Sequence, residues 1–468
     1  MSGIGLHEPA LRRALELALE YLGALDTAAV GATVSSAELR QRLDRPLPDV
    51  GLAAEAVVSE VAAAAQGGLL GNAGGRFFGW VMGGCLPAAL GADWLTSAWD
   101  QVPGAFAVAP SASAVEAVCG RWLLSLLGLP AESSFALVTG CQMAHFTCLA
   151  AARHALLAAR SWDVEQDGLF GAPRLRLVTG DQRHGTVERA VRMLGMGRGS
   201  LLEVPSNARG QLEPAALEQA LRRDRECASI VCLQAGDVNT GVFDPFPELI
   251  EVARRFDAWV HVDGAFGLWA LTSPEHRALG RGAELADSWA TDGHKWLNVP
   301  YDCGYAFVRH PEPHYRAFSH HAAYLQHSET ERDAMDWTPE HSRRARGFAT
   351  YAALLSLGRE GVAQLVSECC RHARELVEGA GRLPGVMVVS AALINQGLLR
   401  FLDPRPDASE ADHDRRTAEV MARINASGEA MFTGTVWKGK RCMRVSVSSW
   451  QTTDRDVQRA VAAIAASL

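Results

Sequence analysis

The stretch DSWATDGHKWLNVPYDCG, residues 287–304, holds a lysine in surroundings that lysine usually avoids. Trp289, Trp296 and Tyr301 flank Lys295. Burial among aromatic side chains disfavours the charged form of an amine, so we predict a lowered pKa and a nucleophilic nitrogen that forms imines with aldehydes. Taken alone, the stretch is equally compatible with a surface lysine whose stem lies along apolar residues.

A carboxylate ends the apolar run WVHVDGA, residues 259–265. The run is typical of a buried strand, and Asp263 lies where the strand is expected to stop. Because an unpaired buried carboxylate is costly, we expect Asp263 to have a cationic or hydrogen-bonding partner. The alternative is that Asp263 only caps a neighbouring turn.

A third feature is the turn that follows FALVTG, residues 135–140. Gly140, Cys141 and Gln142 lead from this run into a helical segment. Free backbone N–H groups and the helix dipole favour an anion at such a point, for example a phosphate. The turn lacks the GxxxxGK[ST] and GxGxxG spacings, so a simple tight turn remains the alternative.

Together these three features predict a site for pyridoxal 5'-phosphate (PLP). In this interpretation the turn holds the phosphate, Asp263 keeps the pyridine nitrogen protonated, and Lys295 forms a Schiff base with the aldehyde. Each feature needs the other two, because none of them is specific by itself.

The elements that must position these residues are short apolar strands that alternate with helices. The predicted strands are residues 135–140, 174–180, 229–236, 259–265, 287–292 and 303–309. This alternation is typical of an α/β fold with a mostly parallel central sheet flanked by helices, in which ligands bind at the carboxyl ends of the strands. We expect a helical N-terminal segment at residues 1–75, a large PLP-binding domain at 76–315, and a mobile loop plus a small C-terminal α+β domain at 316–468.

The composition excludes several classes of protein. Of the 468 residues, 48% are hydrophobic and 21% charged, which is enough apolar material for a large core. The net charge of −8 argues against a nucleic-acid or membrane-surface partner, because such binding needs a cationic face. Without a signal peptide or a membrane-spanning apolar run, we expect a cytoplasmic protein. The ten cysteines lack CxxC pairs, which favours reduced core thiols and no metal site.

The motifs HVDGAFG and DGHKWLNVPYDCG, with the stretches RFFGWVMGGCLPAAL and MRVSVSSW, extend over almost the whole chain. By these motifs the chain resembles the group II PLP-dependent amino acid decarboxylases, the aromatic-L-amino-acid and glutamate decarboxylase-like family, in its bacterial branch. The resemblance implies the type I, aspartate aminotransferase-like fold of PLP-dependent transferases. It also implies a homodimer with the active site at the interface and with N-terminal helices wrapped around the partner.

The resemblance further implies roles for individual residues. It makes Lys295 the Schiff-base lysine, Asp263 the partner of the ring nitrogen and His184 the residue stacked on the ring. The residues implied to bind the cofactor are Gly140, Cys141, Gln142, His184, Asn239, Thr240, Asp263, Ala265, Asp292, His294, Lys295, Gly434 and Thr435. The residues implied to contact the amino acid substrate are Trp80, Met82, Gly83 and Tyr324. Without the resemblance, a turn or core role explains His184 equally well.

The sequence also departs from its relatives. Many of them donate a proton from a tyrosine on a mobile loop, but no tyrosine lies between Leu325 and Thr350, which leaves Tyr324 and His327 as candidate donors. Around the expected phosphate site, Cys141 and His145 replace the usual Gly and Asn, and Gly293 replaces the usual Ala. Arg343, Arg344 and Arg346 are most simply a solvated helix start, although one of them could pair with a substrate carboxylate.

We therefore predict a PLP-dependent lyase that acts at Cα of an L-amino acid, most simply by α-decarboxylation. The missing tyrosine keeps two alternatives open. One is decarboxylation with oxidative deamination to an aldehyde, and the other is β-elimination from an S-conjugated amino acid in secondary metabolism. A cofactor-free scaffold is disfavoured because Lys295, Asp263 and His184 are all present.

Overall fold

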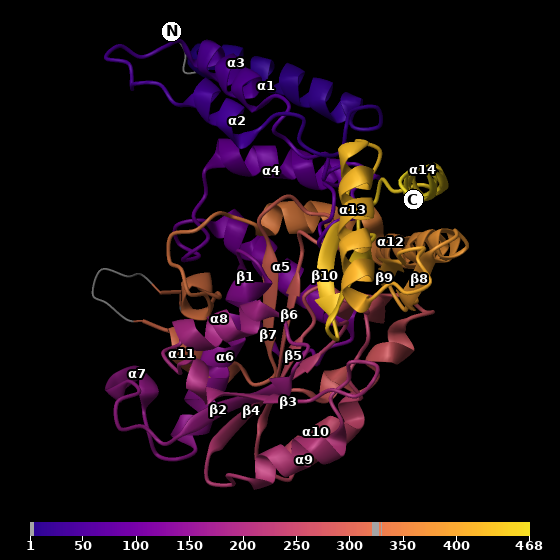
Figure 1. Ribbon diagram of the computed structural model, residues 1–468. Helices are drawn as coiled ribbons and strands as arrows, with labels where there is room; N and C mark the ends of the chain where they lie inside the picture. The colour runs from indigo at the N-terminus through magenta and orange to yellow at the C-terminus, as the bar shows by residue number, and fades with distance from the viewer. Residues whose placement is uncertain (1–3, 321–326, 329) are drawn as a thin grey trace.

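The computed structural model of the protein describes residues 4–320, 327–328 and 330–468. A seven-stranded sheet forms its centre, in the order β1-β7-β6-β5-β4-β2-β3 (Figure 1). Its strands are β1 (Ser134–Val138), β2 (Leu175–Gly180), β3 (Leu201–Val204), β4 (Ala228–Gln234), β5 (Trp259–Asp263), β6 (Ser288–Asp292) and β7 (Gly304–Val308). Neighbouring strands are parallel except that β7 is antiparallel to both β1 and β6. The predicted mostly parallel sheet is confirmed.

Helices cover both faces of this sheet. The helices of this part of the chain are α4 (Pro87–Trp99), α5 (Pro110–Leu127), α6 (Cys141–Ala158), α7 (Val164–Asp167), α8 (Gly185–Met193), α9 (Pro214–Arg222), α10 (Phe246–Arg254) and α11 (Pro311–Phe318). Short 3-10 helices cover Arg198–Ser200, Gly267–Thr272, Arg277–Gly280, Ala283–Leu285 and Ala334–Trp337. Successive strand residues point to opposite faces, so Ile230 packs with α6 and α8 while Val231 packs with α9 and α10. Both faces of β4 are therefore buried, which explains its continuous apolar run.

A second sheet is antiparallel and four-stranded, in the order β10-β11-β9-β8. Its strands are β8 (Val386–Ser390), β9 (Gln396–Phe401), β10 (Thr433–Trp437) and β11 (Lys440–Ser446). The helices of this region are α12 (Gly347–Gly381), α13 (Glu410–Ala426) and α14 (Asp454–Ala466). At Gly358, inside α12, two helices meet at a kink, and the φ of 62° there is one that glycine adopts without strain.

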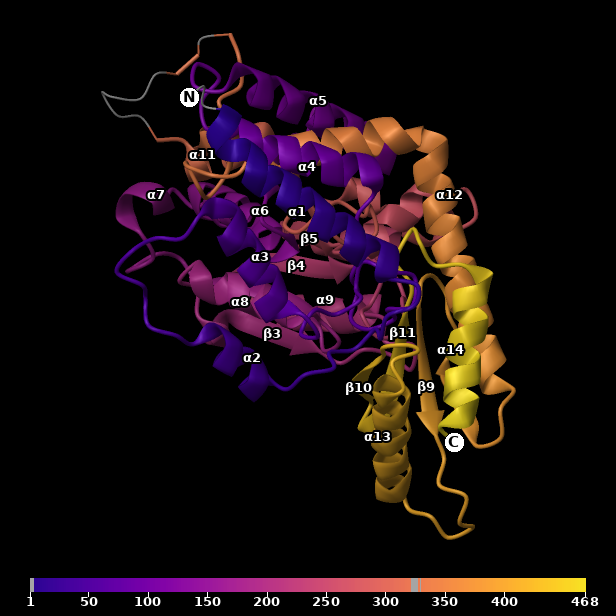
Figure 2. The ribbon, with the colours of Figure 1, turned by 90° about the horizontal axis from the view of Figure 1, so that it is seen from above.

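Three N-terminal helices lie at one end of the molecule, above α4 in the first view (Figures 1 and 2). They are α1 (Ile4–Ala24), α2 (Ser36–Leu43) and α3 (Ala54–Ala65). These helices lie in the segment at residues 1–75 that we expect to be helical, and Leu11, Leu15 and Leu19 of α1 are 57%, 46% and 59% exposed. The apolar stripe of α1 is thus largely uncovered in a single chain. No helix among the described residues has both the length and the apolar composition needed to cross a membrane.

The arginine-rich segment before α12 is not the solvated helix start that the sequence predicts. Arg343 is buried, and its guanidinium donates to both carboxylate oxygens of the equally buried Glu116, at 2.8 and 2.7 Å. It also donates to the carbonyl oxygens of Leu137 and Pro103, at 3.1 and 3.0 Å. The planar fork of arginine can satisfy several acceptors at once, which is why it is tolerated here without water.

Glu116→Gln is expected to lower the free energy of unfolding by about 3–5 kcal/mol, because it leaves the Arg343 charge buried without its counter-charge. Chemical denaturation monitored by circular dichroism measures the change. Glu312→Gln, which removes an exposed ion pair with Arg316 on α11, is the matched control and should cost less than about 1 kcal/mol. Equal decreases in the free energy of unfolding of the two variants would contradict the assignment of Arg343 to the core.

Candidate active site

Lys295 lies just beyond the end of β6. Its Nζ is 2.8 Å from Oδ2 of Asp292, the last residue of that strand. Burial acts to lower the pKa of Lys295, but the charge and hydrogen bond of Asp292, with a smaller effect from the Asp263 charge, outweigh it and raise the pKa. The lowered pKa predicted from the aromatic neighbours is therefore wrong, because a buried carboxylate holds the amine as an ammonium ion.

Asp263 ends β5, the strand next to β6, and its side chain is buried. Its Oδ1 accepts the Ala265 N–H at 3.1 Å and lies 3.5 Å from Nε2 of His145. Burial acts to raise the pKa of Asp263, but the imidazoles of His145 and His184, the Ala265 N–H and the Lys295 charge outweigh it and lower the pKa. Asp263 therefore stays ionised in a site that water scarcely reaches.

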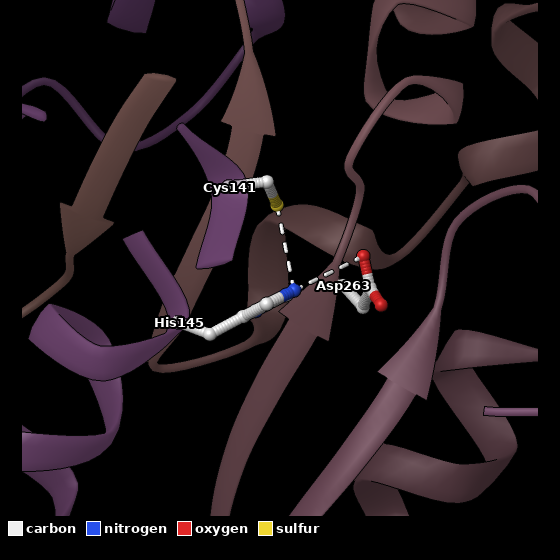
Figure 3. A group of neighbouring side chains, drawn as sticks. All are labelled: Cys141, His145 and Asp263. Atoms are coloured by element: carbon white, nitrogen blue, oxygen red, sulfur yellow. Dashed lines mark hydrogen bonds and ion pairs between the residues drawn. The ribbon is translucent and has the colours of Figure 1, made fainter. Parts of the chain in front are cut away.

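His145 is not where its sequence position suggests. We expect it near the phosphate, yet its ring lies between Asp263 and His261, with Nδ1 2.9 Å from Nε2 of His261. Figure 3 shows Nε2 of His145 directed at Cys141 and Asp263. The ring projects from the first turns of α6, on the same helix face as Cys141, whose Sγ is 3.4 Å from Nε2. His145 thus belongs to the Asp263 side of the site.

The turn at the start of α6 packs closely against the residues after β6. A Cβ on Gly140 would lie 3.0 Å from Cε1 of His294, so this close packing favours glycine. The Cys141 N–H, which we expect to face a phosphate, donates to Oδ1 of Asp292 at 2.5 Å. His294 accepts the Cys303 N–H at 3.1 Å and stacks on Tyr301. Gly140, Cys141, Asp292, His294 and Lys295 are therefore brought together.

Two other positions beside Lys295 require glycine. A side chain there would collide with the lysine backbone or with a tyrosine packed beneath it. A Cβ on Gly83 would overlap the carbonyl oxygen of Lys295, and a Cβ on Gly293 would overlap the hydroxyl of Tyr305. The glycine at 293, where alanine is usual, is thus explained by the buried tyrosine beneath it. Tyr305 in turn is held by Thr350, whose Oγ1 is 2.9 Å from the phenol oxygen.

The remaining predicted cofactor residues are spread over other elements. His184 caps the start of α8, with Nδ1 2.7 Å from Oγ1 of Thr186. Burial lowers the pKa of His184, and the Asp263 charge opposes this effect while the Lys295 charge adds to it. Thr435 of β10 donates to Oδ1 of Asn239 at 2.8 Å, which connects the small sheet to the loop after β4. Gly434 precedes Thr435 on β10, and Thr240 donates to Asp237 at 2.9 Å. Gln142 donates to Sδ of Met193 at 3.7 Å.

The predicted substrate residues are only partly placed. Trp80 is half exposed, and its backbone N–H donates to Oγ1 of Thr433 at 3.0 Å. Met82 is partly buried beside Gly83. Tyr324 lies outside the described residues. The second candidate proton donor, His327, has Nδ1 3.3 Å from Oδ2 of Asp336.

Two groups of side chains gather potential metal ligands. In each, the ligand atoms lie within 4.8 Å of one another, and the groups are Cys141, His145 and Asp263, and His327, Asp333 and Asp336. Burial raises the pKa of Cys141 well above its usual value, so its sulfur is a neutral thiol rather than the thiolate that binds metals. In the second group, Asp333 already accepts the N–H groups of Phe106 and Ser328, both at 2.7 Å.

One buried arginine near the site, Arg444, is not among the residues predicted from the sequence. Arg444 of β11 is buried, which lowers its pKa, and the nearby carboxylate of Asp237 opposes this effect. Asp237 also accepts the backbone N–H groups of Asn239 and Thr240, at 2.9 and 2.8 Å. Arg444 stands inside the quoted stretch MRVSVSSW, where one arginine in an apolar strand is the signal that a partner must exist.

Comparison with known proteins identifies the family. Residues 37–390 match the pyridoxal-dependent decarboxylase conserved domain. The chain belongs to this family. It is 26% identical to the aromatic-L-amino-acid decarboxylase of Bacillus atrophaeus, over 95% of this chain and 92% of that one. It is 28% identical to the 4-hydroxyphenylacetaldehyde synthase of Rhodiola rosea, over 94% and 90%. The crystal structure of Oryza sativa TDC with PLP and tryptamine superposes with a TM-score of 0.92 at 25% identity, over 98% and 96%.

This pyridoxal-dependent decarboxylase has PLP as its cofactor, and the residues present fit that molecule. A primary amine, Lys295, is available for the aldehyde, and a buried ionised carboxylate, Asp263, is available for the ring nitrogen. The glycine turn at the start of α6 lies beside them, packed so closely on His294 that a Cβ at Gly140 would meet the imidazole ring. The predicted fold, family, enzyme class and cofactor are thus confirmed.

Asp292→Asn is expected to speed the attachment of PLP to Lys295 at neutral pH. The change removes the charge that raises the lysine pKa, so burial then lowers it and more of the amine is uncharged. In the unaltered protein the attachment rate should rise about tenfold per pH unit below the lysine pKa, whereas the rate in the variant should level off at a lower pH. Stopped-flow absorbance after mixing apoprotein with PLP measures both profiles.

Asp302→Asn is the control for this experiment, because Asp302 also lies beside the site but pairs with Arg346. Its profile should follow that of the unaltered protein. Identical profiles for the Asp292 variant and the unaltered protein would show that Asp292 does not set the charge of Lys295.

Proposed function

We propose that this enzyme removes the α-carboxyl group of an aromatic L-amino acid, with Lys295 as the residue that carries PLP. The observation that carries the proposal is the pairing of two adjacent parallel strands, β5 and β6, whose carboxyl ends present Asp263 and Asp292 with Lys295 beside them. Parallel strands deliver such groups to one edge of the sheet, where α/β enzymes bind their ligands.

When bound, PLP supplies an electron-accepting ring that stabilises negative charge at Cα of the substrate. The residues of the chain determine how well that ring works and which bond is broken. Asp263, ionised and buried, holds a proton on the ring nitrogen and so keeps the ring positive. The apolar surroundings of the site favour loss of the charged carboxylate, because a carboxylate is poorly stabilised away from water.

The other residue roles follow the same arrangement. We propose that His184 stacks on one face of the ring and Ala265 packs on the other, while His294 and the turn at Gly140 hold the phosphate. The remaining proposed cofactor contacts are Cys141, Gln142, Asn239, Thr240, Asp292, Gly434 and Thr435. For the substrate we propose Trp80, Met82, Gly83 and Tyr324. The hydrogen bond from Thr435 to Asn239 supports a role for β10 beside the ring.

The substrate class is proposed from the relatives. The Bacillus relative is an aromatic-L-amino-acid decarboxylase, and a rice relative at 26% identity is a tryptophan decarboxylase. Both are matched along more than nine-tenths of this chain. An aromatic side chain also suits the apolar residues proposed for the pocket, since it offers a large apolar surface to bury.

A second outcome of the same reaction is oxidation to an aldehyde. Relatives include 4-hydroxyphenylacetaldehyde synthase of Rhodiola rosea and phenylacetaldehyde synthase of Arabidopsis thaliana. The absence of a tyrosine between Leu325 and Thr350 supports it, because the carbanion then lacks the proton donor that many relatives supply. Oxygen is the oxidant: amino acid, O2 and water give aldehyde, CO2, ammonia and hydrogen peroxide.

Product analysis by mass spectrometry, with a panel of L-amino acids and with or without oxygen, tests the proposal. We expect CO2 and an amine from an aromatic substrate in both conditions. An aldehyde with hydrogen peroxide that forms only with oxygen would establish the second outcome. No CO2 from any aromatic amino acid, together with turnover of an acidic or S-conjugated one, would overturn the substrate class.

We further propose that the enzyme is a cytoplasmic homodimer with the active site at the interface. The exposed leucines of α1 support the dimer, because an apolar stripe of this kind normally has a partner. We also propose the division of the chain into residues 1–75, 76–315 and 316–468, for which the two separate sheets give support. Sedimentation analysis of the unaltered protein measures the oligomeric state, and a monomer at all concentrations would contradict the dimer.

A further inference from the structure

A line of polar side chains lies behind Asp263, on the side of the carboxylate that Ala265 and His145 contact. Trp259, His261 and Asp263 alternate along β5, so they point to one face of the strand. Ser288 of β6 pairs in register with His261, and His145 approaches from α6. All five residues are buried. None of the roles proposed above uses His145, His261 or Ser288.

The first three links of this line are short hydrogen bonds, and the fourth is a longer contact with the carboxylate. Trp259 donates its indole N–H to Oγ of Ser288 at 2.9 Å, and the same oxygen is 2.9 Å from Nδ1 of His261. Nε2 of His261 is 2.9 Å from Nδ1 of His145. The last link is the 3.5 Å between Nε2 of His145 and Oδ1 of Asp263, drawn in Figure 3. The two imidazole rings meet edge to face, at 84°.

Each ring carries one proton, because burial lowers the pKa of both imidazoles, that of His261 to about 3. Between Nε2 of His261 and Nδ1 of His145, one nitrogen must therefore donate and the other accept. If His145 donated, its other nitrogen would turn a lone pair towards the Asp263 carboxylate, which is unfavourable in a buried site.

The reverse arrangement satisfies every link. Ser288 accepts from Trp259 and donates to His261, which donates to Nδ1 of His145. The proton of His145 then lies on Nε2 and points at Oδ1 of Asp263. The thiol of Cys141, 3.4 Å from the same nitrogen, is neutral and only a weak acceptor, so the carboxylate is the stronger one.

We propose that His145 is a positioning residue for Asp263: the chain of donors from Trp259 through Ser288 and His261 fixes the proton of His145 on Nε2, and this N–H orients the carboxylate towards the cofactor. With Oδ1 engaged by His145 and Ala265, Oδ2 is the oxygen that meets the ring nitrogen. No proton needs to move along the line. The inference rests on the role of Asp263 given under Proposed function.

Two substitutions of His145 separate its hydrogen bond from its bulk. His145→Gln keeps a donor, because the glutamine amide reaches about as far as Nε2, whereas His145→Leu keeps the volume and removes the donor. Each variant is reconstituted with PLP that carries 15N at the ring nitrogen, and the 15N chemical shift reports whether this nitrogen is protonated. We expect a protonated ring nitrogen in the unaltered protein and in His145→Gln, and a shift towards the unprotonated value in His145→Leu. Loss of bound PLP should also be roughly 10- to 100-fold faster in His145→Leu.

His314→Asn is the matched control. His314 is also fully buried and hydrogen-bonded, to Ser134 and to the carbonyl oxygen of Trp337, and its pKa is likewise lowered to about 3. The control should lose stability but leave the ring-nitrogen shift unchanged. A shift in this variant as large as in His145→Leu would assign the effect to general destabilisation and overturn the proposal.

A second measurement needs no folded variant. In the unaltered protein with 15N-labelled histidine, the tautomer of His145 is observed directly, and protonation at Nε2 is expected. Protonation at Nδ1 would overturn the proposal. The proposal would also fail if the ring nitrogen were equally protonated in the unaltered protein and in His145→Leu. Failure of the proposed function looks different, since product analysis would then find no CO2 from any aromatic amino acid, whereas the tautomer of His145 and the ring-nitrogen shift are measured without a substrate.

Discussion

Lys295→Ala is expected to abolish the attachment of PLP and to reduce kcat by roughly a thousandfold or more, because no other amine replaces the one at the end of β6. The only other lysines of the chain are Lys438 and Lys440, both exposed. Borohydride reduction followed by peptide mass spectrometry locates attached PLP, and product formation gives kcat. PLP can still bind through its phosphate and ring, so the variant should bind it reversibly and more weakly.

Lys440→Ala is the control, since Lys440 forms an ion pair with Glu410 on the surface. It should retain both attachment and turnover. If Lys295→Ala kept the reduced adduct on the same peptide, or turned over at the unaltered rate, Lys295 would not be the residue that carries PLP.

The sequence predicts the large sheet well because its strands are continuous apolar runs. The six predicted strands correspond to β1, β2, β4, β5, β6 and β7. The missed strand, β3, is four residues long and lies at the edge of the sheet, where Glu203 interrupts its apolar character. In the small sheet, β8 and β10 are likewise edge strands with few buried residues, so their patterns are weak.

The part of the candidate site that depends on strand topology alone is predictable from the sequence. Asp263 and Lys295 meet because each follows a strand and the strands are parallel neighbours. Their ionisation is not predictable in this way, since it depends on which side chains of other elements point at them. The raised pKa of Lys295 depends on Asp292, three residues away, whose carboxylate turns back onto the amine.

The surroundings of His145 and Arg343 could not be predicted for the same reason: they depend on side chains from other elements. A motif comparison places His145 near a phosphate because its neighbours in the chain are there, but His145 lies one helical turn further along α6, where its side chain meets His261 and Asp263 of β5. Arg343 stands in a polar segment, and only the fold brings Glu116 of α5 against it. Both side chains find partners far away in sequence, and a single sequence does not encode those partners as a pattern.

Asp263→Asn is expected to leave PLP attached to Lys295 and to reduce kcat roughly 100- to 1000-fold. The neutral amide cannot stabilise a positive charge on the ring nitrogen, so the ring accepts electrons from Cα less readily. The loss should fall on kcat more than on KM, because the charge at the ring nitrogen matters most when negative charge develops at Cα. Steady-state kinetics with the substrate found by product analysis, and the adduct mass after reduction, measure the two effects.

Asp287→Asn separates this electrostatic effect from the loss of a buried carboxylate. Asp287 is also buried and precedes the same strand, β6, but it pairs with Arg254 at the opposite end. Its substitution should lower stability and leave kcat nearly unchanged, whereas the Asp263 variant should lose kcat with its PLP still attached. A variant of Asp263 that kept the unaltered kcat would mean that the ring works without a charged partner, and the strand-end carboxylate would then have only a structural role.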